Sequence, residues 1–124
     1  METSAKKQKR VSDCIYPDAQ GNYVVDNLMF YPKEKALRLE GERIELTSQA
    51  ADLLWILLKM RHYYSTSQDL VTELWPELAK TDSKTWQGRL RMAASRLRKA
   101  LESHSSVHLG CVSKRGYELR MKKE

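Results

Sequence analysis

The sequence predicts an α+β fold in which an N-terminal antiparallel sheet is followed by three helices and a C-terminal β-hairpin. Short apolar segments separated by turns occupy residues 22–47, which is typical of such a sheet. Apolar residues at helical spacing follow in three segments between residues 48 and 101, and two strand-like segments flank a basic turn at residues 107–121. With 124 residues, the chain is long enough for one domain with a core and too short for two ordinary domains.

The composition is that of a globular protein with excess positive charge. Hydrophobic residues make up 41% of the chain and charged residues 31%, which argues against an intrinsically disordered chain. The longest apolar run, Leu53–Leu58, is too short to span a bilayer, and the polar N-terminus lacks the apolar segment of a signal peptide. We therefore expect a cytoplasmic protein. The formal net charge of +6 favours nucleic acid or another anionic partner.

The first 21 residues are predicted to form a basic tail and a turn-rich lead-in, followed by a folded domain at residues 22–121 and a short tail at 122–124. Within the domain, apolar and polar residues alternate in Leu37–Glu40 and again in Arg43–Leu46, with Gly41-Glu42 between them as a hairpin turn. We expect a small antiparallel sheet with one solvated face.

The first predicted helix is the core element of the chain. Thr47 or Ser48 is a good N-cap for it. Residues 49–60 are apolar on almost every side, so the sheet and other helices must cover this helix.

The second predicted helix follows a short extended link at residues 63–65. Thr66 or Ser67 caps this helix, which ends near Pro76, and residues 77–82 are predicted to form a loop. The third helix then begins at Ser83 or Thr85.

The third predicted helix, residues 84–101, has an apolar stripe and a basic outer face. Between Ser83 and Leu101 there are six basic residues and no acidic one. Because a solvated helix normally mixes charges, this face predicts contact with a polyanion such as the major groove of DNA. The alternative is a winged-helix protein-interaction module that docks an acidic partner. The stripe predicted to be buried consists of Trp86, Leu90, Ala94, Leu97 and Leu101.

A predicted β-hairpin follows the basic helix directly. Its first strand is Val107–Val112, its turn is Ser113–Gly116 with the adjacent cations Lys114 and Arg115, and its second strand begins at Tyr117. A basic hairpin in this position is typical of the wing of a winged helix-turn-helix fold. The candidate DNA-binding residues are Lys84, Thr85, Arg89, Arg91, Met92, Ser95, Arg96, Arg98, Lys99, Lys114 and Arg115.

Four motifs in this order resemble the effector domain of the OmpR/PhoB family of bacterial, two-component-like transcription regulators. They are Leu46-Thr47, Ser67-Gln68-Asp69-Leu70 with Leu74-Trp75, Arg96-Leu97-Arg98-Lys99-Ala100-Leu101, and Gly116-Tyr117 with Leu119. The resemblance implies a four-stranded N-terminal sheet, a base-reading role for Arg96 and a position near the DNA backbone for Arg98. It also implies a tandem dimer on double-stranded DNA and RNA polymerase contact through the 76–82 loop, with no cofactor and no small-molecule substrate.

Two departures from that family bear directly on function. The wing arginine is replaced by Ser113, with the cations one and two positions later. The residues before Tyr23 are too few for the receiver domain of a response regulator. We therefore expect a stand-alone domain, a fragment of a response regulator, or the cytoplasmic part of a membrane-anchored regulator of the ToxR/CadC-like subgroup.

The sequence offers little for metal binding or catalysis. Two cysteines are too few for a disulfide framework, and Cys111, between apolar residues, is expected to be buried, with Cys14 as another free thiol. The spacing of His104, His108 and Cys111 matches no standard zinc pattern. A metal-dependent nuclease is not expected, because no cluster of acids or histidines accompanies the basic helix.

Overall fold

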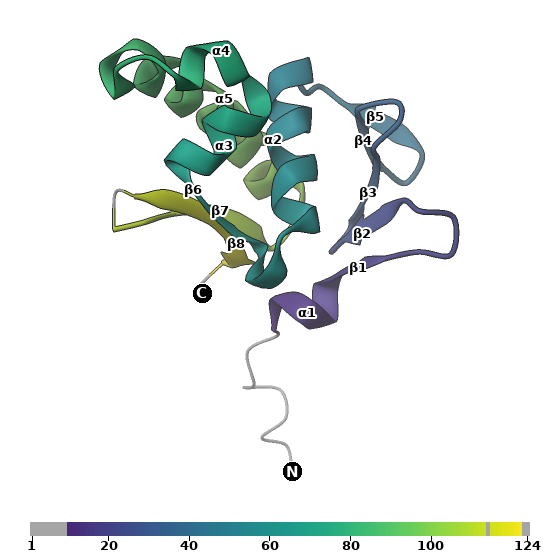
Figure 1. Cartoon of the computed structure of the whole chain (residues 1–124). Helices are drawn as coiled ribbons and strands as arrows, with labels where there is room; N and C mark the ends of the chain where they lie inside the picture. Colours follow the sequence, from purple (N-terminus) through teal and green to yellow (C-terminus); the bar gives the residue numbers. More distant parts are fainter. Residues whose placement is uncertain (1–9, 114, 123–124) are drawn as a thin grey trace.

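The computed structural model describes residues 10–113 and 115–122, which form two antiparallel sheets around a group of helices (Figure 1). A short helix, α1 (Val11–Cys14), precedes the first sheet. The order of strands in that sheet follows the chain. Its strands are β1 (Ile15–Pro17), β2 (Tyr23–Val25), β3 (Leu28–Tyr31), β4 (Ala36–Leu39) and β5 (Glu42–Ile44).

Strand β1 corrects the prediction of a turn-rich lead-in at residues 14–21 and adds a fifth strand to the four that the family resemblance implied. Ile15 pairs with Val25 of β2 and is 1% exposed, so the start of the sheet belongs to the core. Three residues ending in Pro17 are too short to show alternation. The proline is tolerated because β1 lies at the edge of the sheet.

The hairpin between β4 and β5 was predicted correctly, but its turn lies one residue earlier than Gly41-Glu42. Leu39 pairs with Glu42, which leaves Glu40 and Gly41 as the two turn residues. Both have positive φ, 51° and 88°, as a type I′ turn requires, and glycine adopts such an angle at little cost.

Helix α2 (Ser48–Lys59) is the central element, as predicted. Thr47 caps it by accepting a hydrogen bond from the backbone N–H of Ala50 at 3.2 Å. Figure 1 shows α2 between the N-terminal sheet and the other long helices. On the sheet side, the ring of Trp55 packs against Tyr23 and Phe30. The buried side chains of α2 are Ala50, Ala51, Leu53, Leu54, Ile56, Leu57 and Leu58.

The link after α2 contains a short 3₁₀ helix, η2 (Arg61–Tyr63), and strand β6 (Tyr64–Thr66). Thr66 caps helix α3 (Ser67–Leu74) by accepting from the N–H of Asp69 at 3.1 Å, in agreement with the prediction. The predicted loop at 77–82 is wrong in its first half, which belongs to helix α4 (Pro76–Ala79). Pro76 at the first helical position explains this one-turn helix, because its fixed φ suits a helix start.

The third long helix, α5 (Ser83–His104), extends three residues beyond the predicted end at Leu101. Asp82 caps it by accepting from the N–H of Lys84 at 3.0 Å. Strands β7 (Val107–Val112) and β8 (Gly116–Met121) form the predicted hairpin, and β8 lies between β7 and β6 in the second sheet. The described residues include no helix with both the length and the apolar character needed to cross a membrane.

Candidate nucleic-acid interface

The inner side of α5 is buried along its whole length. Each of the five residues predicted for the apolar stripe is no more than 3% exposed, which confirms the prediction. Ala93 and Ala100 are buried beside them, at 2% and 7% exposure. Small side chains on this edge let α5 pack closely against the neighbouring helices, so its rotation about its axis is fixed.

The outer side of α5 carries the predicted basic face. Met92, at 55% exposure, is one of two exposed large hydrophobic residues among the described residues. Within the described part of the chain, no carboxylate lies within 4.0 Å of an α5 lysine or arginine. The positive charge of this face is therefore not neutralised by those residues. Its exposed members are Lys84, Thr85, Arg89, Arg91, Met92, Ser95, Arg96 and Lys99.

The flank of α5 away from the hairpin has two different surroundings along its length. Near the start of the helix, the Arg89 guanidinium lies over the ring of Trp75, with 5.3 Å between Cζ and the ring centroid. Further along, Arg96 and Lys99 line a hollow of about 450 Å³ whose other wall is residues 44–47, the end of β5 and the linker to α2. Arg96 and Lys99 remain exposed there and are not turned into the core.

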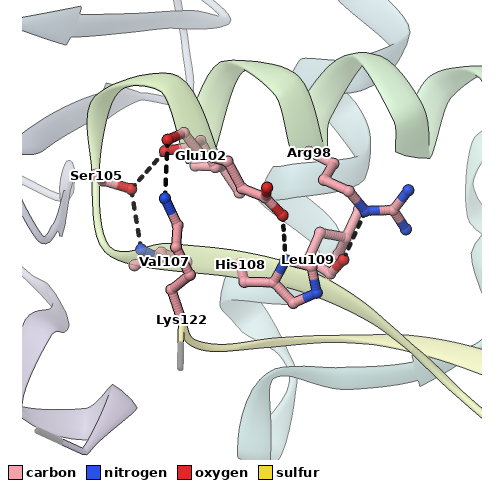
Figure 2. Close-up of polar contacts among 8 residues, drawn as sticks. Arg98, Glu102, Ser105, Val107, His108, Leu109 and Lys122 are labelled. Carbon is pink, nitrogen blue, oxygen red and sulfur yellow. Dashed lines mark hydrogen bonds and ion pairs between the residues drawn. The ribbon is translucent and has the colours of Figure 1, made fainter. Parts of the chain in front are cut away.

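Arg98 differs from the other predicted contacts because it is half-buried on the flank that faces β7. Its Nε–H donates a hydrogen bond of 2.9 Å to the backbone carbonyl of Leu109 (Figure 2). Arg98 therefore joins α5 to the hairpin, a role that the family resemblance did not imply.

Further polar contacts fix the hairpin to the last turn of α5 (Figure 2). Glu102 forms an ion pair with His108 of β7, and its backbone carbonyl accepts a hydrogen bond from Lys122 Nζ at 3.0 Å. The Ser105 hydroxyl accepts from the N–H of Val107 at 3.1 Å. These contacts were missed from the sequence, although Glu102 is notable there as the first acidic residue after the basic segment.

The tip of the hairpin is held against the start of α3. The N–H of Ser67 donates to the carbonyl of Arg115 at 2.7 Å, and Gly116 pairs with Thr66. Arg115 is exposed, as a wing cation should be. Lys114, the other predicted wing cation, lies outside the described residues.

Cys111 corrects a prediction, because it is exposed rather than buried. It lies near the end of β7, opposite Tyr117 of β8. Burial raises the pKa of the Tyr117 phenol above 10.0, and the nearby Cys111 raises it further, whereas Arg98 and Arg91 lower it.

Among the described residues, no group of three or more His, Cys, Asp or Glu side chains is placed to hold a metal ion.

Comparison with known proteins agrees with this architecture. The crystal structure of the DNA binding domain of CpxR from E. coli matches with a TM-score of 0.62, 24% sequence identity, and coverage of 79% of this chain and 94% of that chain. This likeness supports the winged-helix fold predicted from the sequence. No curated protein matches the chain. Residues 41–119 match the model of the family described as "Transcriptional regulatory protein, C terminal", which confirms the resemblance to OmpR/PhoB-type effector domains. The chain therefore belongs to the Trans_reg_C family of C-terminal domains of transcriptional regulatory proteins.

Proposed function

We propose that this domain binds double-stranded DNA in a sequence-specific manner and regulates transcription. The observation that carries the proposal is the outer face of α5, where exposed basic side chains have no acidic partner among the described residues. A helix of this width fits the major groove, and its cations suit phosphates and guanine edges. The CpxR domain, which has the same fold, is described as DNA binding.

The proposed contacts divide into those that set the position of the domain and those that read bases. Arg96 is proposed to read a base, with Met92 and Ser95 beside it on the outer face. The remaining exposed cations of α5 would bind the phosphates that border the major groove. Arg115 in the hairpin turn, with Lys114, would bind the flanking backbone or the minor groove.

Selection of bound sites from random DNA tests the proposal and defines the site. On the selected site, Arg96→Ala should cost about 1–3 kcal/mol of binding free energy and relax preference at one base position. Arg115→Ala should weaken binding to all DNA sequences alike, and it should reduce the slope of log affinity against log salt concentration by about one. Lys33→Ala serves as a matched control, because Lys33 is an exposed cation in the turn between β3 and β4.

Two results would contradict the proposal. Equal losses on selected and random DNA for Arg96→Ala would remove its base-reading role. Binding that has no sequence preference and vanishes at modest salt would favour the protein-interaction module, with an acidic partner on the same face.

From the family resemblance, we further propose contact with RNA polymerase through residues 76–82 and tandem binding to repeated half-sites. Glu77 is the better residue for the polymerase test, because it is exposed and its only described ion-pair partner is Lys80. Asp82 caps α5, so changing it would also weaken the proposed DNA-binding helix. Glu77→Lys should change transcription but not DNA affinity, and no change in transcription would count against this surface.

A further inference from the structure

We infer that Trp75 is a positioning residue for DNA binding, which holds Arg89 ready to contact a backbone phosphate. The inference rests on the proposed function and assigns Arg89 to the DNA backbone rather than to base reading. The contact that supports it is a cation–π contact in which the Arg89 guanidinium lies over the Trp75 ring, with Cζ 5.3 Å from the centroid. This distance lies within the range of cation–π interactions.

Backbone hydrogen bonds on both sides of Trp75 fix its main chain between α3 and α4. Its N–H donates to the carbonyl of Val71 in α3 at 2.7 Å, and its own carbonyl accepts from the N–H of Ala79 in α4 at 2.9 Å. The ring is half-buried and packs against the core. Trp75 is therefore a rigid platform at the corner between two helices, against which a flexible side chain can be ordered.

An aromatic platform leaves the guanidinium free to bind an anion. No carboxylate of the described residues lies within 4.0 Å of Arg89, and Glu77 of α4 pairs with Lys80. A carboxylate would neutralise the charge and occupy the N–H donors of arginine. A ring face does neither, so an arginine held over a ring keeps its N–H donors for a phosphate.

The contact with Trp75 favours the backbone over the bases for Arg89. Arg89 shares its flank of α5 with Arg96, seven residues later, but only Arg89 of the two lies over the Trp75 ring, which draws it toward the α3–α4 corner. Met92 and Ser95 lie nearer the middle of the outer face. A side chain held at the edge of a helix in the major groove meets the phosphates that border the groove.

A double-mutant cycle tests the inference by fluorescence anisotropy with the site selected from random DNA and a random-sequence duplex of equal length. Arg89→Ala should weaken binding to both duplexes alike and reduce the salt slope by about one. Trp75→Leu should weaken both by about three- to tenfold, because an arginine that is not pre-ordered loses side-chain freedom on binding. In the Arg89→Ala background, Trp75→Leu should cause no further loss of DNA affinity. In an Arg91→Ala background, Trp75→Leu should reduce DNA affinity by the same factor as in the wild type.

Two further measurements separate positioning from simple support of the fold. Trp75→Phe keeps an aromatic ring and should retain most of the affinity. In the free protein, the Arg89 side-chain protons should show a ring-current shift that Trp75→Leu abolishes. Thermal unfolding identifies any variant whose loss reflects misfolding.

Additive losses in the cycle, or a change of base preference in Arg89→Ala, would overturn the inference. An absent ring-current shift would also overturn it. A wild-type chain that binds neither duplex would overturn the proposed function together with the phosphate contact. That outcome is distinguishable, because the ring-current shift of free Arg89 does not depend on DNA.

Discussion

Replacing Gly116 with alanine tests how the hairpin is attached to the helical part of the domain. Gly116 begins β8 and pairs with Thr66 of β6 and Val112 of β7. A Cβ at this position would lie 2.4 Å from the carbonyl oxygen of Ser65 and 3.0 Å from the Cα of Thr66. Both are backbone atoms, so the strands must move apart to accept even one methyl group.

The expected loss of stability follows from this crowding. Forcing a methyl group into a packed site costs about 1–3 kcal/mol, offset by about 0.4–1 kcal/mol because alanine restricts the unfolded chain more than glycine does. A net loss of about 1–2 kcal/mol in a domain of this size lowers Tm by roughly 4–10 °C. DNA affinity should fall on every sequence, because β6 supports the hairpin at the end that carries Arg115.

The same substitution at Gly88 provides the matched control. Gly88 lies within α5, and a Cβ there meets nothing within 4 Å. Gly88→Ala should therefore stabilise the domain by about 1 kcal/mol through helix propensity alone. Both variants are compared by thermal unfolding followed by circular dichroism. A Gly116→Ala domain as stable as the wild type would refute the conclusion that the Ser65 carbonyl excludes a side chain.

Three other predictions concern single contacts. Arg98→Met should cost about 1–2 kcal/mol of stability because it removes the Nε hydrogen bond to the Leu109 carbonyl. An unchanged Tm with lost DNA affinity would instead mean that Arg98 contacts the DNA backbone. Tyr63→Phe should cost about 1 kcal/mol in denaturant unfolding because the phenol donates to the carbonyl of Ile15 at 3.1 Å, and an unchanged midpoint would contradict this. Burial raises the pKa of Tyr117 above 10.0, so the folded state holds the phenol proton more tightly than the unfolded chain does. The contribution of the neutral Tyr117 phenol to folding stability is therefore fully present below pH 10 and is lost as pH rises through the folded pKa. Tyr117→Phe should reduce the fall in Tm at alkaline pH. An equal fall in the wild type and the variant would exclude Tyr117 as its source.

The sequence was a good guide to the long helices. Helices α2 and α5 each repeat their apolar spacing over several turns, and Thr47 and Thr66 are N-caps whose chemistry is local. The identity of the buried stripe on α5 follows from periodicity, since residues at i, i+4 and i+7 share a face wherever the helix is placed. Such features need no knowledge of the neighbouring elements.

The short elements were less predictable because their partners decide them. Strand β1 has three residues and becomes a strand by pairing with β2. Helix α4 is a single turn, and the Gln68 side chain of α3 donates a hydrogen bond to the carbonyl of its last residue, Ala79, at 3.3 Å. The turn at Glu40-Gly41 depends on which residues of β4 and β5 face each other. In each case the sequence contains too few residues for a periodic signal.

The arginines of α5 illustrate the same limit at the candidate site. Periodicity places Arg89, Arg96 and Arg98 off the buried stripe, and the structure agrees, but it does not say what each flank meets. On one flank, β7 offers the Leu109 carbonyl and takes Arg98 into the fold. On the other, Trp75 orders Arg89, whereas Arg96 borders an open hollow with no acidic partner among the described residues. Three arginines on one helix thus have three different surroundings: Arg98 donates to a carbonyl, Arg89 lies over a ring, and Arg96 has neither contact, which is consistent with its proposed base-reading role.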